Sequence, residues 1–133
     1  MAKLIKKNEP FNKRLSYAFR GLLAIWQKEA SFRIQIALSL GLLFFCLAVR
    51  PPAIWCGLFT CAVITVLTLE IVNTAFESLL DKFHPEYDPQ VGFIKDCLAG
   101  AVLVASIGSV LIFIFYLRTE FALESIDQLF GLH

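Results

Sequence analysis

The sequence predicts an all-α integral membrane protein, with one surface helix followed by three transmembrane helices in a single domain. Its 133 residues are 58% hydrophobic and only 17% charged, and the mean hydropathy is +0.71. Two stretches, residues 51–69 and 97–117, contain no charged side chain, and a helix needs about 20 mostly apolar residues to cross a bilayer. A soluble helical bundle of this length could hardly bury both stretches on every face.

The N-terminal part, residues 10–33, predicts an amphipathic helix that lies along the membrane surface. Apolar side chains recur at helical spacing on one face, and basic side chains interrupt or oppose them. The apolar set is Phe11, Leu15, Ala18, Leu22, Ile25 and Trp26, and the basic set is Lys13, Arg14, Arg20 and Lys28. Packing of the apolar face on protein would explain the same pattern, so both interpretations remain open.

Three membrane helices are expected, over residues 34–49, 51–80 and 96–117. The first contains only 16 residues, all uncharged, and it becomes long enough if Phe32 and the aliphatic stem of Arg33 extend it to the interface. Residues 118–133 form an outer tail that could fold as a short amphipathic helix on the membrane surface. We expect this tail to take no part in chemistry.

The distribution of Lys and Arg predicts the topology. Eight of the 12 basic residues precede the first membrane helix, and basic residues near membrane helices favour the cytoplasmic side. We therefore expect the N-terminus and the loop 81–96 in the cytoplasm. The turn 50–53 and the C-terminus are then outside.

The cysteines predict neither a zinc site nor a disulfide framework. Cys46, Cys56, Cys61 and Cys97 lie in apolar segments and form no C-x-x-C pair, so we expect buried free thiols. Both histidines are isolated in the sequence. Neither of the common glycine-rich nucleotide motifs occurs, and no nucleic-acid partner is expected.

The segment LEIVNTAFESLLD, residues 69–81, carries a polar stripe at the end of an apolar run. A helix turns about 100° per residue, so Glu77 and Asp81 each lie within about 20° of Glu70. Asn73 and Thr74 fall on the same face. A carboxylate exposed to lipid costs roughly 2.5 kcal/mol or more at the bilayer centre. The stripe therefore predicts a polar cavity that faces protein, water or a cation.

The spacing leaves several roles open for these acids. Paired carboxylates suit a hard divalent cation, and a single carboxylate could act as a base at membrane depth. Structural pairing with neighbouring segments is equally compatible, and the candidate partners are Glu29, Arg33, Lys95 and Asp96. Lys95 is also a candidate phosphate ligand, while Asp96 could cap the third membrane helix or orient Lys95.

Four segments stand out as motifs: WQKEASFR (26–33), EIVNTAFESLLD (70–81), PEYDP (85–89) and KDCLAGAVL (95–103). Together they resemble the small bacterial membrane diacylglycerol kinases and their undecaprenol kinase relatives. The resemblance implies a homotrimer in the bacterial cytoplasmic (inner) membrane, with sites between protomers near the cytoplasmic face. It also implies transfer of the γ-phosphate of MgATP, with Mg²⁺ as cofactor, to a lipid alcohol. The first acceptor to consider is diacylglycerol, which gives phosphatidic acid, and the alternative is undecaprenol.

The resemblance also implies roles by position. Glu70 matches the general base that takes the proton of the lipid hydroxyl, and Asn73 matches its polar partner. Glu29 and Glu77 match the magnesium ligands. The implied nucleotide-binding residues are Tyr17, Glu29, Glu77, Glu86, Tyr87, Asp88, Lys95 and Asp96. The implied residues on the lipid side are Glu70, Asn73, Trp26, Ser31, Phe32, Arg33 and Ala99.

The chain departs from the family pattern on the acceptor side. Gln35 stands where the diacylglycerol kinases carry an acid, Pro10 replaces a basic residue, and Ala99 replaces a small hydroxyl residue. The segments FRIQ and KDCLAGAVL lean towards the undecaprenol kinases, so the acceptor stays open. An intramembrane Glu70 is also compatible with a proton-coupled carrier, and the stripe as a whole with a structural membrane adaptor.

Overall fold

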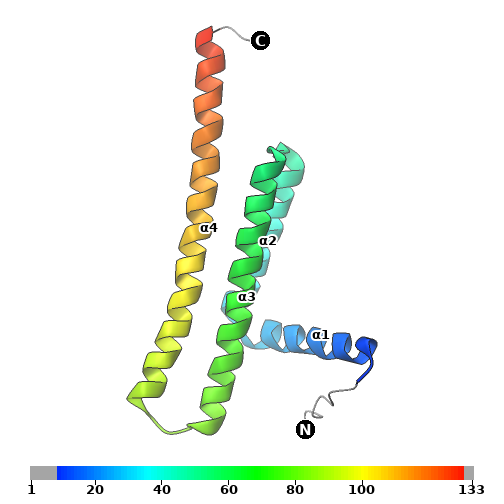
Figure 1. Ribbon diagram of the computed structural model, residues 1–133, viewed down its shortest axis with the longest axis vertical. Coiled ribbons are helices and arrows are strands. Elements are labelled where there is room, and N and C mark those ends of the chain that lie inside the picture. The colour runs from blue at the N-terminus through cyan, green and yellow to red at the C-terminus, as the bar shows by residue number, and fades with distance from the viewer. Residues whose placement is uncertain (1–8, 131–133) are drawn as a thin grey trace.

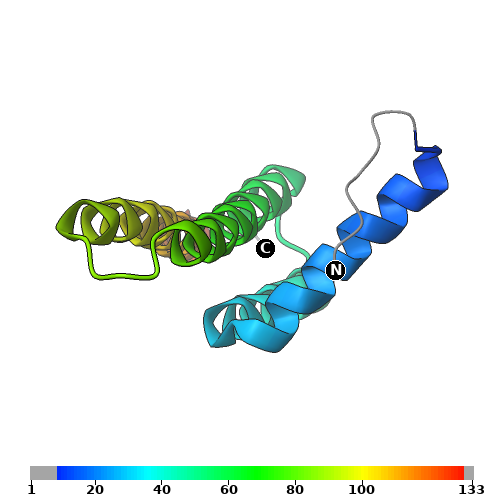
Figure 2. The ribbon, with the colours of Figure 1, turned by 90° about the horizontal axis from the view of Figure 1, so that it is seen from below.

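The computed structural model describes residues 9–130, which fold into four helices (Figure 1). They are α1 (Phe11–Lys28), α2 (Ala30–Val49), α3 (Ala53–Phe83) and α4 (Pro89–Phe130). The last three run up and down beside one another, whereas α1 lies across their lower end, as the view from below in Figure 2 also shows. Three helical stretches are long and apolar enough to cross a membrane: Ala30–Val49, Ala53–Phe83 and Pro89–Ala122. The expected all-helical membrane architecture is confirmed.

A single non-helical residue, Glu29, separates α1 from α2. Its backbone is extended, with φ −105° and ψ 118°, while its N–H still bonds to the last turn of α1 at 2.8 Å. The guanidinium of Arg33 donates to the carbonyls of Trp26 and Gln27 at 2.9 and 3.4 Å, which satisfies acceptors that the end of α1 leaves free. Residues 30–33 therefore belong to α2. The sequence-based prediction had included them in the surface helix.

Two prolines set the turn between α2 and α3. Arg50 adopts the left-handed conformation, with φ 54° and ψ 54°, and Pro51 disfavours a right-handed helical conformation in the residue before it. Pro52 is extended, with ψ 141°, and precedes the first helical residue. For this reason α3 begins at Ala53 rather than at residue 51.

The connection between α3 and α4 is shorter than expected and consists of residues 84–88. The carboxylate of Asp88 accepts a hydrogen bond from the N–H of Gln90 at 2.8 Å. Because proline suits the first helical position that follows such a cap, Asp88 and Pro89 start α4. The suggestion that Asp96 caps this helix is wrong, since Asp96 lies about two turns inside α4.

At its other end α4 runs without a break to Phe130. Its 42 residues extend over about 63 Å at 1.5 Å per residue. The expected separate helix in the tail is not observed, because residues 118–130 continue α4; residues 131–133 lie outside the described part. Neither Gly nor Pro occurs from Ser109 to Phe130, so this stretch lacks a strong helix terminator.

Aromatic side chains fasten the three long helices together at the end away from α1. The cluster consists of Phe45 of α2, Trp55 and Phe59 of α3, and Phe113 and Tyr116 of α4. Neighbouring ring centroids lie 5.5 to 6.3 Å apart, a separation at which an aromatic pair contributes about 0.5–1.5 kcal/mol beyond its burial. Phe59 and Tyr116 are 3% and 4% exposed, so the cluster is the most enclosed apolar part of the bundle.

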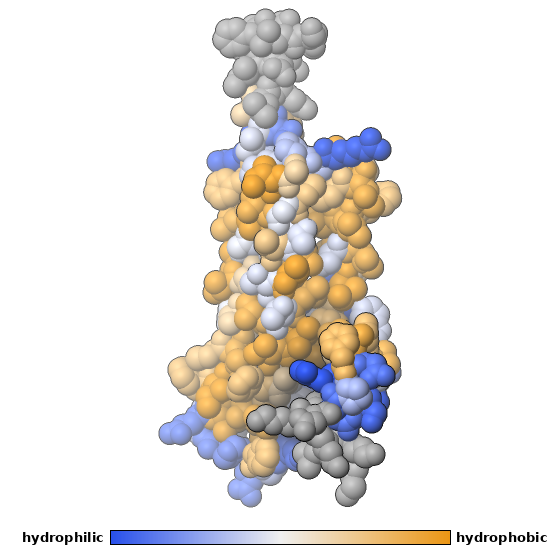
Figure 3. Space-filling view, turned by 45° about the vertical axis from the view of Figure 1, so that its right-hand side comes forward, coloured by the Kyte–Doolittle hydropathy of each residue, from blue (hydrophilic) through white to orange (hydrophobic). Residues whose placement is uncertain are grey.

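Most other apolar side chains face outward. Figure 3 shows a broad hydrophobic band over the long helices, with hydrophilic side chains gathered towards the ends. A surface of this kind is typical of helices that face lipid or another chain. All four cysteines are free, as expected, but none is fully buried: Cys46 and Cys56 are half-buried, and Cys61 and Cys97 are exposed.

Candidate active site

The polar face of α3 changes from buried to exposed towards its C-terminal end. Glu70 and Thr74 are only 5% and 4% exposed, Asn73 and Glu77 are half-buried, and Asp81 is exposed. At its buried end the stripe therefore faces protein, as the cost of a lipid-exposed carboxylate requires. Its exposed end approaches the α3–α4 loop.

Glu70 is held by a residue of α2. The side-chain amide Nε2 of Gln35 donates to Oε2 of Glu70 at 3.3 Å. Because α2 and α3 are antiparallel, a residue early in α2 comes to lie beside the middle of α3. Sequence reasoning noticed Gln35 only as a departure from the family pattern. The contact itself depends on the register between the two helices, which the spacing of residues does not give.

Asn73 and Glu77 form a second contact on the same face. Nδ2 of Asn73 donates to Oε1 of Glu77 at 3.1 Å, and a spacing of four residues brings side chains together on a helix. Oδ1 of Asn73 and Oγ1 of Thr74 are buried without a hydrogen-bond partner within residues 9–130. A buried unpaired polar atom costs about 1–3 kcal/mol, so this face offers hydrogen-bonding capacity that the described chain leaves unused.

Lys28 joins the α1–α2 junction to α3. Its Nζ lies 3.4 Å from Oε1 of Glu29 and donates to Oγ of Ser78 at 3.1 Å. Since Ser78 directly follows Glu77, the carboxylate of Glu29 lies near the turn of α3 that carries Glu77. Sequence reasoning identified the two acids but missed the link between them. The only available signal was that Lys28 and Glu29 are neighbours in the sequence.

On α4, Lys95 forms an ion pair with Asp81 of α3. Structural pairing with Lys95 was one of the alternatives left open by the sequence, and the structure contains this ion pair for Asp81. Their side chains are 32% and 61% exposed, and exposed pairs contribute only about 0–1 kcal/mol to stability. Lys95 can therefore exchange Asp81 for another anion at little cost.

The model of the prokaryotic diacylglycerol kinase family matches residues 16–117. The chain belongs to this family. It is 34% identical over 110 residues to the diacylglycerol kinases of Escherichia coli strain K12 and of Shigella flexneri, which covers 82% of this chain and 89% of each of those proteins. A diacylglycerol kinase of Synechocystis is 30% identical over 97 residues, or 72% of this chain and 55% of that protein. The resemblance of the four motifs is confirmed.

As a member of the diacylglycerol kinase family, the chain is a lipid kinase of the diacylglycerol kinase type. A kinase family implies a nucleotide as the phosphoryl donor. Together with the three membrane-spanning helices, the family also establishes a multi-pass membrane protein. The carrier and adaptor interpretations lose their basis, since neither accounts for membership in a kinase family.

The kinase offers two carboxylates that fit a nucleotide-bound magnesium ion. Within residues 9–130, no three or more His, Cys, Asp or Glu side chains converge on one point. Glu29 and Glu77 come from different segments and are both half-buried. Lys28 contacts Glu29 and also Ser78, the neighbour of Glu77 in the sequence. Magnesium is commonly held by one or two carboxylates together with phosphate oxygens and water. Glu29 and Glu77 therefore suit an ion that is also bound by phosphate oxygens and water, and not an ion held by protein ligands alone.

The other residues implied in nucleotide binding lie near the same end of the kinase. Glu86, Tyr87 and Asp88 line a pocket of about 360 Å³ in the α3–α4 loop. Tyr17 is on α1, and Asp96 is exposed on α4. In the part of the chain that the structure describes, no hydrogen bond or ion pair joins any of these five residues to the carboxylates of α3.

The residues implied on the lipid side are divided between the junction and the surface. Phe32 is 5% exposed and Arg33 holds the end of α1. Trp26, Ser31 and Ala99 are exposed on α1, α2 and α4 respectively. The single chain therefore gathers part of the predicted site and leaves the rest facing outward.

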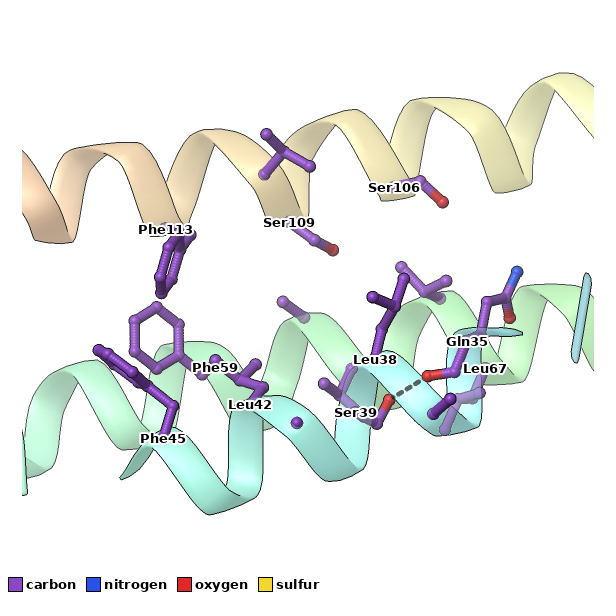
Figure 4. A pocket seen from close by; sticks show the side chains of 16 residues that line it. Gln35, Leu38, Ser39, Leu42, Phe45, Phe59, Leu67, Ser106, Ser109 and Phe113 are labelled. Carbon is purple, nitrogen blue, oxygen red and sulfur yellow. Dashed lines mark hydrogen bonds between the residues drawn. The ribbon is translucent and has the colours of Figure 1, made fainter. Parts of the chain in front are cut away.

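A groove of about 550 Å³ runs between α2, α3 and α4 (Figure 4). Its lining is apolar except for Gln35 and three serines. Ser39, Ser106 and Ser109 each donate to the backbone carbonyl four residues earlier, at 2.7 to 2.9 Å. Gln35 lies at one end of the groove, opposite the aromatic cluster, and connects it to Glu70.

Proposed function

We propose that this lipid kinase transfers the γ-phosphoryl group of MgATP to the hydroxyl of diacylglycerol and so makes phosphatidic acid. The observation that carries the proposal is Glu70, a carboxylate that is 5% exposed within a membrane-spanning helix. Burying an acid at membrane depth is costly and usually marks a functional site. The relatives that the chain matches are diacylglycerol kinases, which is why diacylglycerol is the proposed acceptor.

In this proposal Glu70 is the general base. Its carboxylate takes the proton of the acceptor hydroxyl while the hydroxyl oxygen attacks the γ-phosphorus and the bond to ADP breaks. A positioned base usually contributes about 10²–10⁴-fold to a rate. Glu77 lies about 10 Å further along the helix axis, so the transferring group fits between the acceptor and the nucleotide.

Glu29 and Glu77 are the proposed ligands of the magnesium ion that accompanies ATP. A magnesium ion bound there would neutralise charge on the nucleotide phosphates. Asn73 orients Glu77 through its amide, and Lys28 keeps Glu29 beside α3.

The nucleotide would bind at the lower end of the bundle in Figure 1. Lys95 exchanges Asp81 for a phosphate, and the adjacent Asp96 orients Lys95. The remaining nucleotide contacts in the proposal are Tyr17 of α1 and Glu86, Tyr87 and Asp88 of the loop pocket.

The acceptor would approach from the membrane near the α1–α2 junction. There α1 would lie as an amphipathic helix in the interface, with its apolar face towards the acyl chains. The residues proposed to line the acceptor route are Trp26, Ser31, Phe32, Arg33 and Ala99. A polar head group at this level meets Glu70 while the hydrocarbon stays in the membrane.

The proposal also includes the assembly and its orientation. The active end would face the cytoplasm of a bacterial cell, in the cytoplasmic membrane, as the bias of Lys and Arg supports. A homotrimer would complete the site from neighbouring protomers. The outward-facing apolar surface (Figure 3) is consistent with further protein contacts.

The decisive experiment uses purified full-length protein in mixed micelles with radiolabelled ATP and magnesium. Diacylglycerol and undecaprenol are offered separately, and Glu70→Gln is the matched control. We expect label in phosphatidic acid, and a rate at least roughly a hundredfold lower in the control. Label in undecaprenyl phosphate alone would replace the proposed acceptor. No labelled lipid from folded protein would refute the proposed reaction.

A further inference from the structure

The hydrogen bond between Gln35 and Glu70 makes the two oxygens of the carboxylate different. Oε2 accepts from Nε2 of Gln35 at 3.3 Å. Oε1 receives no hydrogen bond from residues 9–130. This oxygen is also not fully enclosed by the chain. One oxygen is therefore fixed by α2, while the other remains within reach of a molecule from outside the chain.

The amide of Gln35 has no second partner that would explain its orientation. Its Oε1 is buried and unpaired within the described chain. The groove serines do not use it, because their hydroxyls bond to backbone carbonyls; Ser39, for example, donates to the main-chain oxygen of Gln35 at 2.7 Å (Figure 4). An amide beside a carboxylate presents its N–H, since two acceptor oxygens would repel each other. Glu70 is therefore the only hydrogen-bond partner of this side chain within residues 9–130.

We propose that Gln35 is a positioning residue for Glu70, so that Oε1 of the carboxylate takes the proton of the acceptor hydroxyl. The inference rests on the proposed role of Glu70 as the general base. A neutral amide suits this task because it donates a hydrogen bond without adding a charge next to the base. Orientation matters, since a misplacement of about 1 Å at a reacting group can lower a rate by about a hundredfold.

A purely structural Gln35 would behave differently. Polar side chains often join membrane helices by hydrogen bonds, and such a residue would affect packing whether or not Glu70 can act as a base. A positioning residue acts through the base. Its removal should therefore matter only while the base is present.

The test is a double-mutant cycle on the full-length kinase in mixed micelles. Gln35→Leu, Glu70→Gln and the double variant are compared with the parent for kcat and for the KM of ATP and diacylglycerol. We expect Gln35→Leu to lower kcat roughly tenfold or more with little change in either KM. The double variant should be no slower than Glu70→Gln. Ser39→Ala removes a hydroxyl from the same groove that does not contact Glu70, and it should keep the parental rate.

Parental activity of Gln35→Leu would overturn the proposal, as would an equal fold loss with and without Glu70. If Glu70→Gln itself keeps the parental rate, the general base is misassigned instead, so the two failures can be told apart. Should Gln35→Leu not fold, Gln35→Met retains the length of the side chain and removes the hydrogen-bond donor to Glu70. We expect the same loss of kcat in this variant. Parental kcat in Gln35→Met would also overturn the proposal.

Discussion

Asn73 donates a hydrogen bond from Nδ2 to Oε1 of Glu77, 3.1 Å away on the next turn of α3. If Glu77 binds the magnesium of MgATP, loss of this donor should leave its carboxylate poorly oriented. We expect Asn73→Leu to lower kcat/KM for MgATP by about tenfold or more, the usual cost of losing a residue that supports a metal ligand. Initial rates over a magnesium titration provide the measurement. An unchanged magnesium dependence would separate Asn73 from the metal site.

Glu70→Gln preserves the size of the side chain and keeps an oxygen that can accept the hydrogen bond from Gln35. It removes the negative charge and, with it, the ability to take a proton. We expect a loss of at least roughly a hundredfold in kcat with little change in thermal stability. Phosphorylated lipid and the melting temperature are measured on the same preparation. Near-normal turnover would exclude Glu70 as the base.

The number and approximate position of the membrane helices could be predicted, because a long uncharged segment is what allows a helix to span a bilayer. The end of α1 could not be predicted, because a single extended residue, Glu29, separates α1 from α2. The start of α4 was misplaced for a similar reason. The segment from Pro89 to Asp96 was predicted as loop, yet the Asp88 cap and Pro89 begin a helix there.

The candidate site shows the same division between local and non-local information. The stripe from Glu70 to Asp81 follows from helical geometry within one segment, and the structure places it on one face. The contact of Gln35 with Glu70 and the bridge made by Lys28 depend on how two helices are aligned. The spacing of residues within one segment does not determine how two helices are aligned, so both contacts were missed.

Glu29→Gln and Glu77→Gln should each raise the magnesium concentration needed for half-maximal activity. A carboxamide keeps one oxygen ligand but removes the negative charge that favours a hard cation. Activity of each variant is measured from low to saturating magnesium at fixed ATP. Glu120→Gln is the matched control, because Glu120 lies outside the matched family region. Parental magnesium dependence in both test variants would place the metal elsewhere.

The proposed topology predicts that the α3–α4 loop is cytoplasmic and the end of α4 is outside. A reporter inserted beside Asp88 should show cytoplasmic activity, and one fused after Leu117 should show activity outside the cytoplasm. Both fusions are made in the same bacterial host and normalised to protein amount. The reverse pattern would put the polar face of α3 on the side without ATP and would end the proposed function.

Removal of residues 121–133 should leave lipid kinase activity largely intact. These residues lie beyond the region that matches the family, which ends at residue 117. Every proposed catalytic or binding residue lies on the α1 side of the aromatic cluster, whereas residue 121 lies beyond that cluster along α4.

The cut after Glu120 also preserves the aromatic cluster, because Phe113 and Tyr116 remain in α4. A small decrease in melting temperature is expected, since the shortened helix loses its last turns. The measurement is diacylglycerol phosphorylation by the truncated protein, normalised to the amount of folded protein and compared with the full chain at the same magnesium and ATP concentrations. If turnover is abolished while folding and assembly stay normal, the end of α4 takes part in function and the site is not confined to the α1 side of the bundle.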